Sequence, residues 1–443
     1  MTISTAETET TLPTPAPTDL PASDRNRILI YLGVLTLMVT FGAPYLGLIN
    51  LPVTYFLKNK LHFGAVQVAE FGLVTGLPLY FSAAWGFVRD NWNPFGIRDR
   101  GYMILFGFIC AATYAIFAFA PVSATGLAVA VIVLTSAYLF VQSGQLGLTG
   151  AIGRQHVMSG QVSAVWNAVN AIPTLAAFAF GGYLSDALEG KHAEQAARTL
   201  FLIGGAVLAA IAAFAVWRPR VVYDNVHEEH APVVNPLQDV ARLLRHKPIY
   251  PALFIWFLWN FAPGSGVPLQ FFLQDTLHAS DHTFGLWNAV FAGFFIPTYM
   301  LYGVLCRRVK LAGLIFWGTV IGIPQMVPLL FIHSPDMAVI MAAPSGLMGG
   351  LCTAAYLDLV IRSCPKGLEG TMLMLTTALY WIVTRLGDLL GTYLYAHFGG
   401  FGVCVLAITV VYALILPAIL LVPKRLLATA DGETPAGGGF DAD

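Results

Sequence analysis

Long apolar runs recur along the whole chain, separated by shorter polar links. A helix that crosses a bilayer needs about 20 mostly apolar residues, and twelve runs meet this requirement. They lie at residues 28–50, 65–88, 101–120, 124–148, 160–186, 199–217, 249–274, 284–306, 310–332, 337–360, 370–396 and 399–422. The pattern predicts an all-α membrane protein with twelve transmembrane helices. Very short links make antiparallel hairpins of spans three and four and of spans eleven and twelve.

The longest internal loop has the pattern of a short amphipathic helix. Pro236 suits a first helical turn. Apolar residues then follow at i, i+3, i+4 and i+7, namely Leu237, Val240, Ala241 and Leu244. We expect this helix to lie on the cytoplasmic face, within a linker of residues 218–248. The linker separates an N-terminal six-helix bundle, residues 28–217, from a C-terminal six-helix bundle, residues 249–422.

Composition agrees with a membrane protein. Charged residues make up 11% of the chain, whereas soluble domains carry about 25%. The formal net charge of −1 argues against a nucleic-acid partner. The five cysteines have no spacing typical of a metal site or a disulfide framework, and we expect no cofactor. Residues 1–27 and 423–443 are expected to be disordered tails.

The distribution of Lys and Arg predicts the orientation in the membrane. With both termini inside, cytoplasmic segments hold eighteen of the 23 basic residues, and Arg385 is the only one inside a span. This predicts a multi-pass protein of the cell membrane, the inner membrane in a bacterium, with both termini cytoplasmic.

The two bundles carry a weak internal repeat. Span two ends in Gly86-Phe87-Val88-Arg89-Asp90, and span eight ends in Gly303-Val304-Leu305-Cys306-Arg307-Arg308. The second copy therefore lacks the acid of the first. Paired repeats suit a transporter in which two bundles alternate access to a site near the bilayer midplane.

These features resemble the major facilitator superfamily, and within it the folate-biopterin transporter family. Three stretches carry the resemblance: residues 86–102 between spans two and three, Phe261-Ala262-Pro263-Gly264 with Phe271-Phe272 in span seven, and Cys364-Pro365-Lys366-Gly367-Leu368-Glu369-Gly370 before span eleven. The muropeptide-permease and siderophore-importer branches share much of this pattern. The resemblance implies two pseudo-symmetric six-helix bundles and secondary transport by alternating access.

The resemblance also implies a gate on the cytoplasmic side. In such a gate, the acid after span two contacts the N-terminal end of a helix in the opposite half when the protein is outward-open. In this sequence the gate residues are Gly86, Arg89, Asp90, Arg98 and Arg100, and Glu369 before span eleven is a second candidate acid. The alternative is a solvated loop that only fixes the topology.

Arg385 and Asp388 lie near the middle of span eleven, where a charge is costly. They are three residues apart and share a helix face. We expect Arg385 to face the cavity and bind an anionic group of the solute, with Tyr380 and Trp381 close by. The alternative is an ion pair with Asp388 that only makes the helix tolerable in lipid.

Other polar and aromatic residues in the spans are candidates for solute contacts. They are Trp256, Trp259 and Asn260 in span seven, Asn167 and Asn170 in span five, Gln142 and Gln145 in span four, and Tyr356 in span ten. Pro263 and Gly264 predict a break or hinge in span seven. The alternatives are an interfacial aromatic belt in span seven and amides that only join neighbouring helices.

Three carboxylates are candidates for proton coupling: Asp388, Glu70 in span two and Asp358 in span ten. Burial favours the neutral form of a carboxylate, which suits a group that cycles between protonation states. Asp358 has an alternative partner in Arg362, four residues on.

The sequence therefore predicts a monomeric secondary transporter, not an enzyme. It would move an organic, anionic, ring-containing solute such as a folate or pterin with H⁺. No nucleotide-binding loop of the Gly-xxxx-Gly-Lys type is present in the sequence. The alternatives are a siderophore, muropeptide or drug transporter on the same fold, and a membrane assembly factor that transports nothing.

Overall fold

A computed structural model describes residues 20–45, 53, 56–57, 61–63, 65–120, 123–189, 193–224 and 236–433. Every regular element among these residues is a helix. Helices occupy all twelve predicted spans, and eight of the described helices are long and apolar enough to cross a membrane. The expected all-helical architecture is therefore confirmed.

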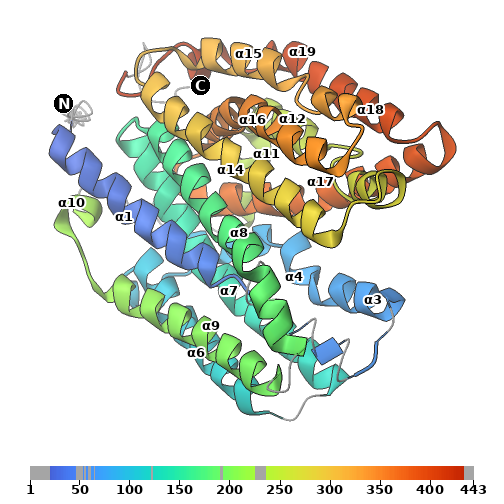
Figure 1. Cartoon of the computed structure of the whole chain (residues 1–443). Helices are drawn as coiled ribbons and strands as arrows, with labels where there is room; N and C mark the ends of the chain where they lie inside the picture. Colours follow the sequence, from blue (N-terminus) through green and yellow to red (C-terminus); the bar gives the residue numbers. More distant parts are fainter. Residues whose placement is uncertain are drawn as a thin grey trace, which may run out of the picture.

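The first six spans form one half of the molecule, the N-half, coloured blue to green in Figure 1. Its helices are α1 (Ala22–Phe41), α3 (Ala65–Thr75), α4 (Leu77–Tyr80), α5 (Ala83–Asn91), η2 (Pro94–Gly96), α6 (Asp99–Phe119), α7 (Ala124–Gln155), α8 (Ser159–Glu189) and α9 (Ala193–Val216). Span two is thus made of three consecutive helices.

The remaining helices form the linker and the C-half, coloured light green to red in Figure 1. The linker holds α10 (Arg220–Tyr223) and α11 (Pro236–Arg245), so the predicted amphipathic helix is present. The C-half consists of α12 (Ile249–Asn260), α13 (Val267–Phe271), η3 (Phe272–Thr276), α14 (Asp281–Leu305), α15 (Leu311–Gly322), η4 (Val327–Phe331), α16 (Pro335–Ser363), α17 (Glu369–His397), α18 (Phe401–Ala413) and α19 (Ile415–Ile419). A last short helix, α20 (Lys424–Leu427), follows.

Span seven breaks where the sequence predicts. Between α12 and α13 lies Gly264, whose φ of +130° is a backbone conformation that L side chains rarely adopt. A Cβ on Gly264 would lie 2.5 Å from Cβ of Cys404. Glycine is therefore required here both for the backbone conformation and for the close approach of α18.

The two halves meet along two sets of helices. In one set α17 packs on α4, α5 and α7, and in the other α8 packs on α14 and α16. The first ten residues of α17, Glu369–Ala378, are mostly buried, whereas beyond them only the face of Val383, Gly387 and Gly391 is buried. The halves therefore pack closely around the start of α17 and less closely beyond it.

Both chain ends are more ordered than the sequence predicts. Residues 22–27 belong to α1, which begins one to two turns before the apolar run that starts at residue 28. Residues 423–433, hereafter the C-terminal segment, are docked rather than disordered: Leu426 is fully buried, and Asp431 is 6% exposed. Specific polar contacts hold this segment, and composition alone does not reveal them. The remainder of both predicted tails, residues 1–19 and 434–443, lies outside the described residues.

Candidate functional site

Asp90, in the last turn of α5, reaches across to the N-terminus of α17 in the other half. Its carboxylate accepts hydrogen bonds from the backbone N–H of Thr371 at 2.6 Å and of Gly370 at 3.3 Å. It also accepts one from Oγ1 of Thr371 at 2.5 Å. The first N–H groups of a helix lack intrahelical partners and carry partial positive charge. Asp90 therefore caps α17 from the opposite half.

Arg89 orients Asp90. Its Nη1 lies 2.6 Å from Oδ1 of Asp90, and its Nε donates to Oδ1 of Asp99 at 2.6 Å. One guanidinium thus bridges two carboxylates, and the exposed fraction of its own side chain is 7%. A buried charge needs such pairing to be tolerated.

Among the described residues, Arg98 and Arg100 form no salt bridge with Asp90 or Asp99, although the charge of Arg98 acts on Asp99, and their expected role in the gate stays a prediction. The backbone N–H of Arg98 donates to Asn93. The guanidinium of Arg100 donates instead to the carbonyl oxygens of Ala215 and Val216, the last residues of α9. A guanidinium satisfies the unpaired carbonyl groups of a helix C-terminus, so Arg100 stabilises the end of α9. The residue that joins Arg89 and Asp90 in the cluster is Asp99, which pairs with Arg89.

Gly86 allows α5 and α17 to touch through their backbones. A Cβ on Gly86 would lie 2.4 Å from the carbonyl oxygen of Gly370 and 2.8 Å from Cα of Thr371. One turn earlier, Oγ of Ser82 donates to the carbonyl oxygen of Met374 at 3.0 Å. No side chain larger than hydrogen fits at Gly86 while the two halves stay in this contact.

Glu369 contacts the other half through an ion pair. Its Oε1 lies 3.2 Å from Nη1 of Arg154, in the last turn of α7, and the two side chains are 11% and 6% exposed. The expected helix cap at α17 is supplied by Asp90, and Glu369 bonds to a basic residue instead. A second link between the halves therefore lies beside the first.

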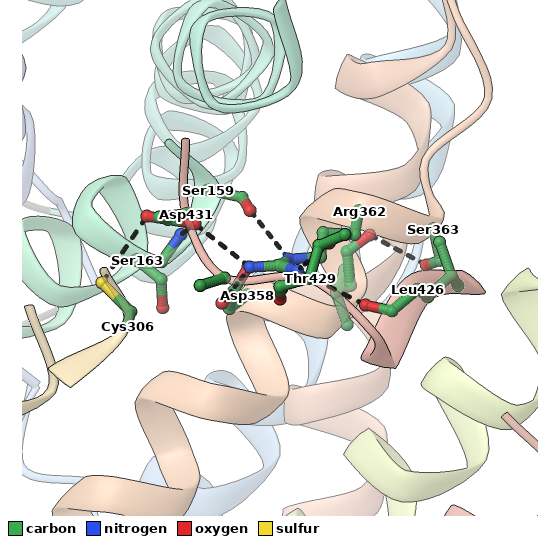
Figure 2. Close-up of polar contacts among 12 residues, drawn as sticks. Ser159, Ser163, Cys306, Asp358, Arg362, Ser363, Leu426, Thr429 and Asp431 are labelled. Atoms are coloured by element: carbon green, nitrogen blue, oxygen red, sulfur yellow. Dashed lines mark hydrogen bonds and ion pairs between the residues drawn. The ribbon is translucent and has the colours of Figure 1, made fainter. Parts of the chain in front are cut away.

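A third link surrounds Arg362, near the end of α16 (Figure 2). Its Nε donates to Oδ1 of Asp358 at 2.8 Å and to Oγ of Ser159, the first residue of α8, at 3.1 Å. Asp358 also accepts from the hydroxyl of Tyr302 at 2.6 Å. The pairing of Asp358 with Arg362 that the sequence offers as an alternative is thus present.

Asp431 of the C-terminal segment completes this third link, with Oδ1 at 3.1 Å from Nη2 of Arg362. Burial raises the pKa of the Asp431 carboxyl, and Asp358 adds to the rise, while Arg362 opposes it. The three links lie where α5, α7, α14 and α16 end and α8 and α17 begin, which we call the latch end.

Arg385 lies further along α17, beyond the tightly packed region. Its side chain is exposed, and among the described residues it makes no hydrogen bond or ion pair. Asp388 interacts with it through charge but forms no salt bridge to it among the described residues, and Oδ1 of Asp388 accepts the backbone N–H of Val267 at 3.2 Å. The alternative in which Arg385 only pairs with Asp388 is therefore absent from this structure.

Trp381 lies one turn before Arg385 and shares its helix face, so the contacts of Trp381 indicate which way this face points. Trp381 packs edge-on against Tyr45 of the N-half, with ring centroids 5.6 Å apart, and against Tyr380 at 5.5 Å. The buried face of Val383 and Gly387 points the opposite way, because Arg385 lies two residues, about 200°, from each. Arg385 therefore projects toward the N-half.

Gln142 and Tyr45 extend this aromatic group into the N-half. The hydroxyl of Tyr45 donates to Oε1 of Gln142 at 3.1 Å, and its ring packs edge-on against Tyr138. Sequence reasoning missed Tyr45, which lies beyond the last turn of α1. The sequence feature that could have identified Tyr45 is its position close to the end of an apolar run, since tyrosines are common at membrane interfaces.

Four other candidates on the C-half form contacts within that half. Trp256 and Trp259 are each 8% exposed and Tyr356 is 1% exposed. Nε1 of Trp256 donates to Thr376, Asn260 donates to Trp256, and Tyr356 shares a hydrogen bond with Thr319. Trp259 stacks on Tyr412. The predicted role in solute contact does not fit Trp256, Trp259 and Tyr356, because neighbouring helices cover them.

The amides of the N-half also bond within the protein. Gln145 donates to Thr36 and Thr149, Asn167 donates to Ser163, and Asn170 accepts from Thr40. Two of these bonds join α1 to α7 and α8. Their geometry matches the alternative in which amides hold helices together.

The remaining candidates lie apart. Glu70 is exposed on α3, and Asp358 belongs to the latch end. Pro263 and Gly264 lie against α17, since a Cβ on Gly391 would be 2.6 Å from the backbone nitrogen of Gly264. The break in span seven therefore serves the packing of α17 as well as any bending.

The sequence profile of the Major Facilitator Superfamily matches residues 155–387, more than half of the chain. The chain belongs to the Major Facilitator Superfamily. It is 26% identical over 356 residues to a folate-biopterin transporter of Synechocystis sp., which covers 76% of this chain and 69% of that relative.

Solved transporters share the fold of this Major Facilitator Superfamily member. FucP in the outward conformation aligns over 89% of this chain and 98% of its own, with a TM-score of 0.68 and 12% identity. The human organic anion transporter MFSD10 aligns over 90% and 100%, with a TM-score of 0.56 and 14% identity. Identities this low show the fold alone. The chain is a multi-pass membrane transporter of this superfamily.

Asp90→Ala is expected to destabilise the closed latch end of this superfamily member by about 1–2 kcal/mol, because a helix loses its cap. The distance between spin labels on Arg220 and Arg308, both exposed, should then show a longer population. The five native cysteines are buried and should label slowly. As a control, Asp336→Ala removes an exposed acid from the first turn of α16. Identical distance distributions for both variants would rule out a latching role for Asp90.

Proposed function

We propose that this chain is a secondary active transporter that moves an organic, anionic, ring-containing solute by alternating access, driven by protons. The exposed, unpaired Arg385 carries the proposal. A guanidinium in a membrane span needs a partner or water, and no hydrogen bond or ion pair within the described residues supplies one. A carboxylate of the solute would fit its planar fork in a bidentate manner.

The aromatic side chains beside Arg385 suit a flat ring. Trp381 packs against both Tyr45 and Tyr380, and Tyr380 is 43% exposed. Gln142 uses its oxygen to accept from Tyr45, which leaves its NH₂ group to donate to a ring nitrogen or carbonyl. Folate-like solutes combine such a ring with carboxylates. The 26% identity to a folate-biopterin transporter agrees with this chemistry.

Alternating access is supported by the contrast between the two regions of α17. Links between the halves gather at the latch end, and the later turns of α17 are covered on one face only. The bias of Lys and Arg supports a cytoplasmic position for the latch end, with both termini on that side of the cell membrane. On this reading the molecule is outward-facing and acts as a monomer.

Asp388 is the carboxylate we assign to proton coupling. It lies one turn from Arg385 on α17, accepts a single backbone N–H and forms no salt bridge among the described residues, so it can take up a proton with little rearrangement. Asp358, by contrast, is held by Arg362 and Tyr302 at the latch end. Glu70 is exposed on α3, away from these groups, and is the weaker candidate.

Uptake into proteoliposomes tests the proposal. We expect radiolabelled folate or pterin conjugates to accumulate at least fivefold over protein-free liposomes when the outside is acidic, and far less without a pH gradient. Siderophores, muropeptides and neutral drugs serve as comparison solutes, and uptake of one of these alone would replace the solute class. No uptake of any solute in either condition would favour the non-transporting assembly factor.

A further inference from the structure

The C-terminal segment forms hydrogen bonds to the C-half. The backbone N–H of Asp431 donates to the carbonyl oxygen of Cys306, at the end of α14, at 2.9 Å. The carbonyl oxygen of Thr429 accepts from Nη1 of Arg362 at 2.9 Å and from the N–H of Leu311 at 3.3 Å. The segment is thus fixed to the ends of α14 and α16 and to the start of α15.

The segment also forms hydrogen bonds to the N-half. The Asp431 carboxylate accepts the backbone N–H groups of Gly160 at 3.1 Å and Gln161 at 2.9 Å, in the first turn of α8. The N–H of Gly432 donates to the carbonyl oxygen of Val157 at 2.7 Å. Figure 2 shows Asp431 between Cys306 on one side and Arg362 on the other, with Ser159 beside Arg362. One acid therefore joins a helix N-terminus of the N-half to a guanidinium of the C-half.

The arrangement mirrors the one around Asp90. Asp90 comes from the N-half and caps α17 of the C-half, while Asp431 comes from the C-half and caps α8 of the N-half. Arg89 bridges Asp90 to Asp99, and Arg362 bridges Asp431 to Asp358. Each side of the latch end thus has an acid at a helix N-terminus and an arginine between two carboxylates.

The internal repeat explains why the second acid comes from so far away. In the first copy Asp90 lies four residues after Gly86, and in the second copy the residue four after Gly303 is Arg307. Span eight therefore cannot supply a cap to α8. Cys306, the residue before Arg307, contacts Asp431 through its carbonyl oxygen and through Sγ at 3.5 Å. The C-terminal segment places an acid beside the position where the repeat has lost one.

We propose that Asp431 acts as the missing second gate acid, and that undocking of the C-terminal segment accompanies opening of the latch end. The proposal rests on the alternating-access mechanism proposed above. It makes the residues after span twelve part of the transport machinery. A transporter that lacks them would spend less time with its latch end closed.

Hydrogen exchange measured by mass spectrometry on the full chain tests this directly. Asp431→Ala should speed exchange about tenfold or more at the start of α8, residues 159–163, because two capped N–H groups lose their acceptor. It should also speed exchange at the start of α17, residues 369–373, because the two halves then part at all three links of the latch end. Lys424→Ala, an exposed position on the same segment, should change neither region.

Two outcomes overturn the proposal. Unchanged exchange at both regions would mean that Asp431 does not hold the halves together. Faster exchange at α8 alone would mean that Asp431 is a local helix cap. A chain ending at Ala428 serves as the second variant if Asp431→Ala does not fold, and the same two regions are measured. Exchange needs no solute, so its result stands even if no transport of any solute is found.

Discussion

Arg385→Gln is expected to lower uptake of the anionic solute at least 100-fold while leaving the protein folded. The variant keeps a polar side chain but removes the charge and the two parallel donors that a carboxylate requires. Removing one partner of a desolvated, hydrogen-bonded charge pair costs about 2–5 kcal/mol. Because Arg385 is exposed and contacts no other described residue through a hydrogen bond or ion pair, folding should not depend on it.

Solute affinity of the purified protein is the measurement that isolates this effect. Arg385→Lys should bind with intermediate affinity, since it keeps the charge and loses the planar fork. Arg198→Gln, an exposed position on α9, makes the same chemical change away from the aromatic group and should behave as the wild type. Wild-type affinity in Arg385→Gln would exclude Arg385 as the anion-binding residue.

Hydropathy was sufficient to locate the helices, because a membrane span needs a long apolar run, and few other structures contain one. It did not show that span two is divided into α3, α4 and α5, since the run from 65 to 88 stays apolar across both breaks. The position of Asp90 was also accessible, because a short local motif marks the loop after span two. The resemblance placed its partner only at the N-terminal end of a helix in the opposite half, and the structure shows that this helix is α17.

The contacts of the second acid could not be predicted from the sequence. Asp431 lies 271 residues from Gly160, within a stretch of small and polar residues of the kind usually found in disordered tails. Its docking depends on backbone groups of α8 and α14, which leave no side-chain pattern. Similarly, the i, i+3, i+4 spacing of Trp256, Trp259 and Asn260 shows that they share a face. The spacing cannot show that the face is covered by α16, α17 and α18.

Gly86→Ala is expected to keep the latch end from closing and to reduce transport at least tenfold. The added Cβ would meet only backbone atoms, the carbonyl oxygen and carbon of Gly370 and Cα of Thr371, at 2.4, 2.7 and 2.8 Å. Backbone cannot move aside as a flexible side chain can, so α5 and α17 must separate. Asp90, one turn after Gly86, would then be drawn away from the N–H groups that it caps. Overpacking of this kind typically costs about 1–3 kcal/mol.

Gly72→Ala is the matched control, because it makes the same change on span two where no atom lies within 4 Å of the new Cβ. Alanine is favoured over glycine in a helix by about 1 kcal/mol, so intrinsic propensity would stabilise both variants. A loss of uptake in Gly86→Ala alone, with the lengthened distance between labels on Arg220 and Arg308, would therefore arise from the contact with α17. Equal uptake by the two variants would mean that transport does not need this backbone contact. The closed latch end would then be a resting state outside the cycle, and the mirrored acids at α8 and α17 would serve stability alone.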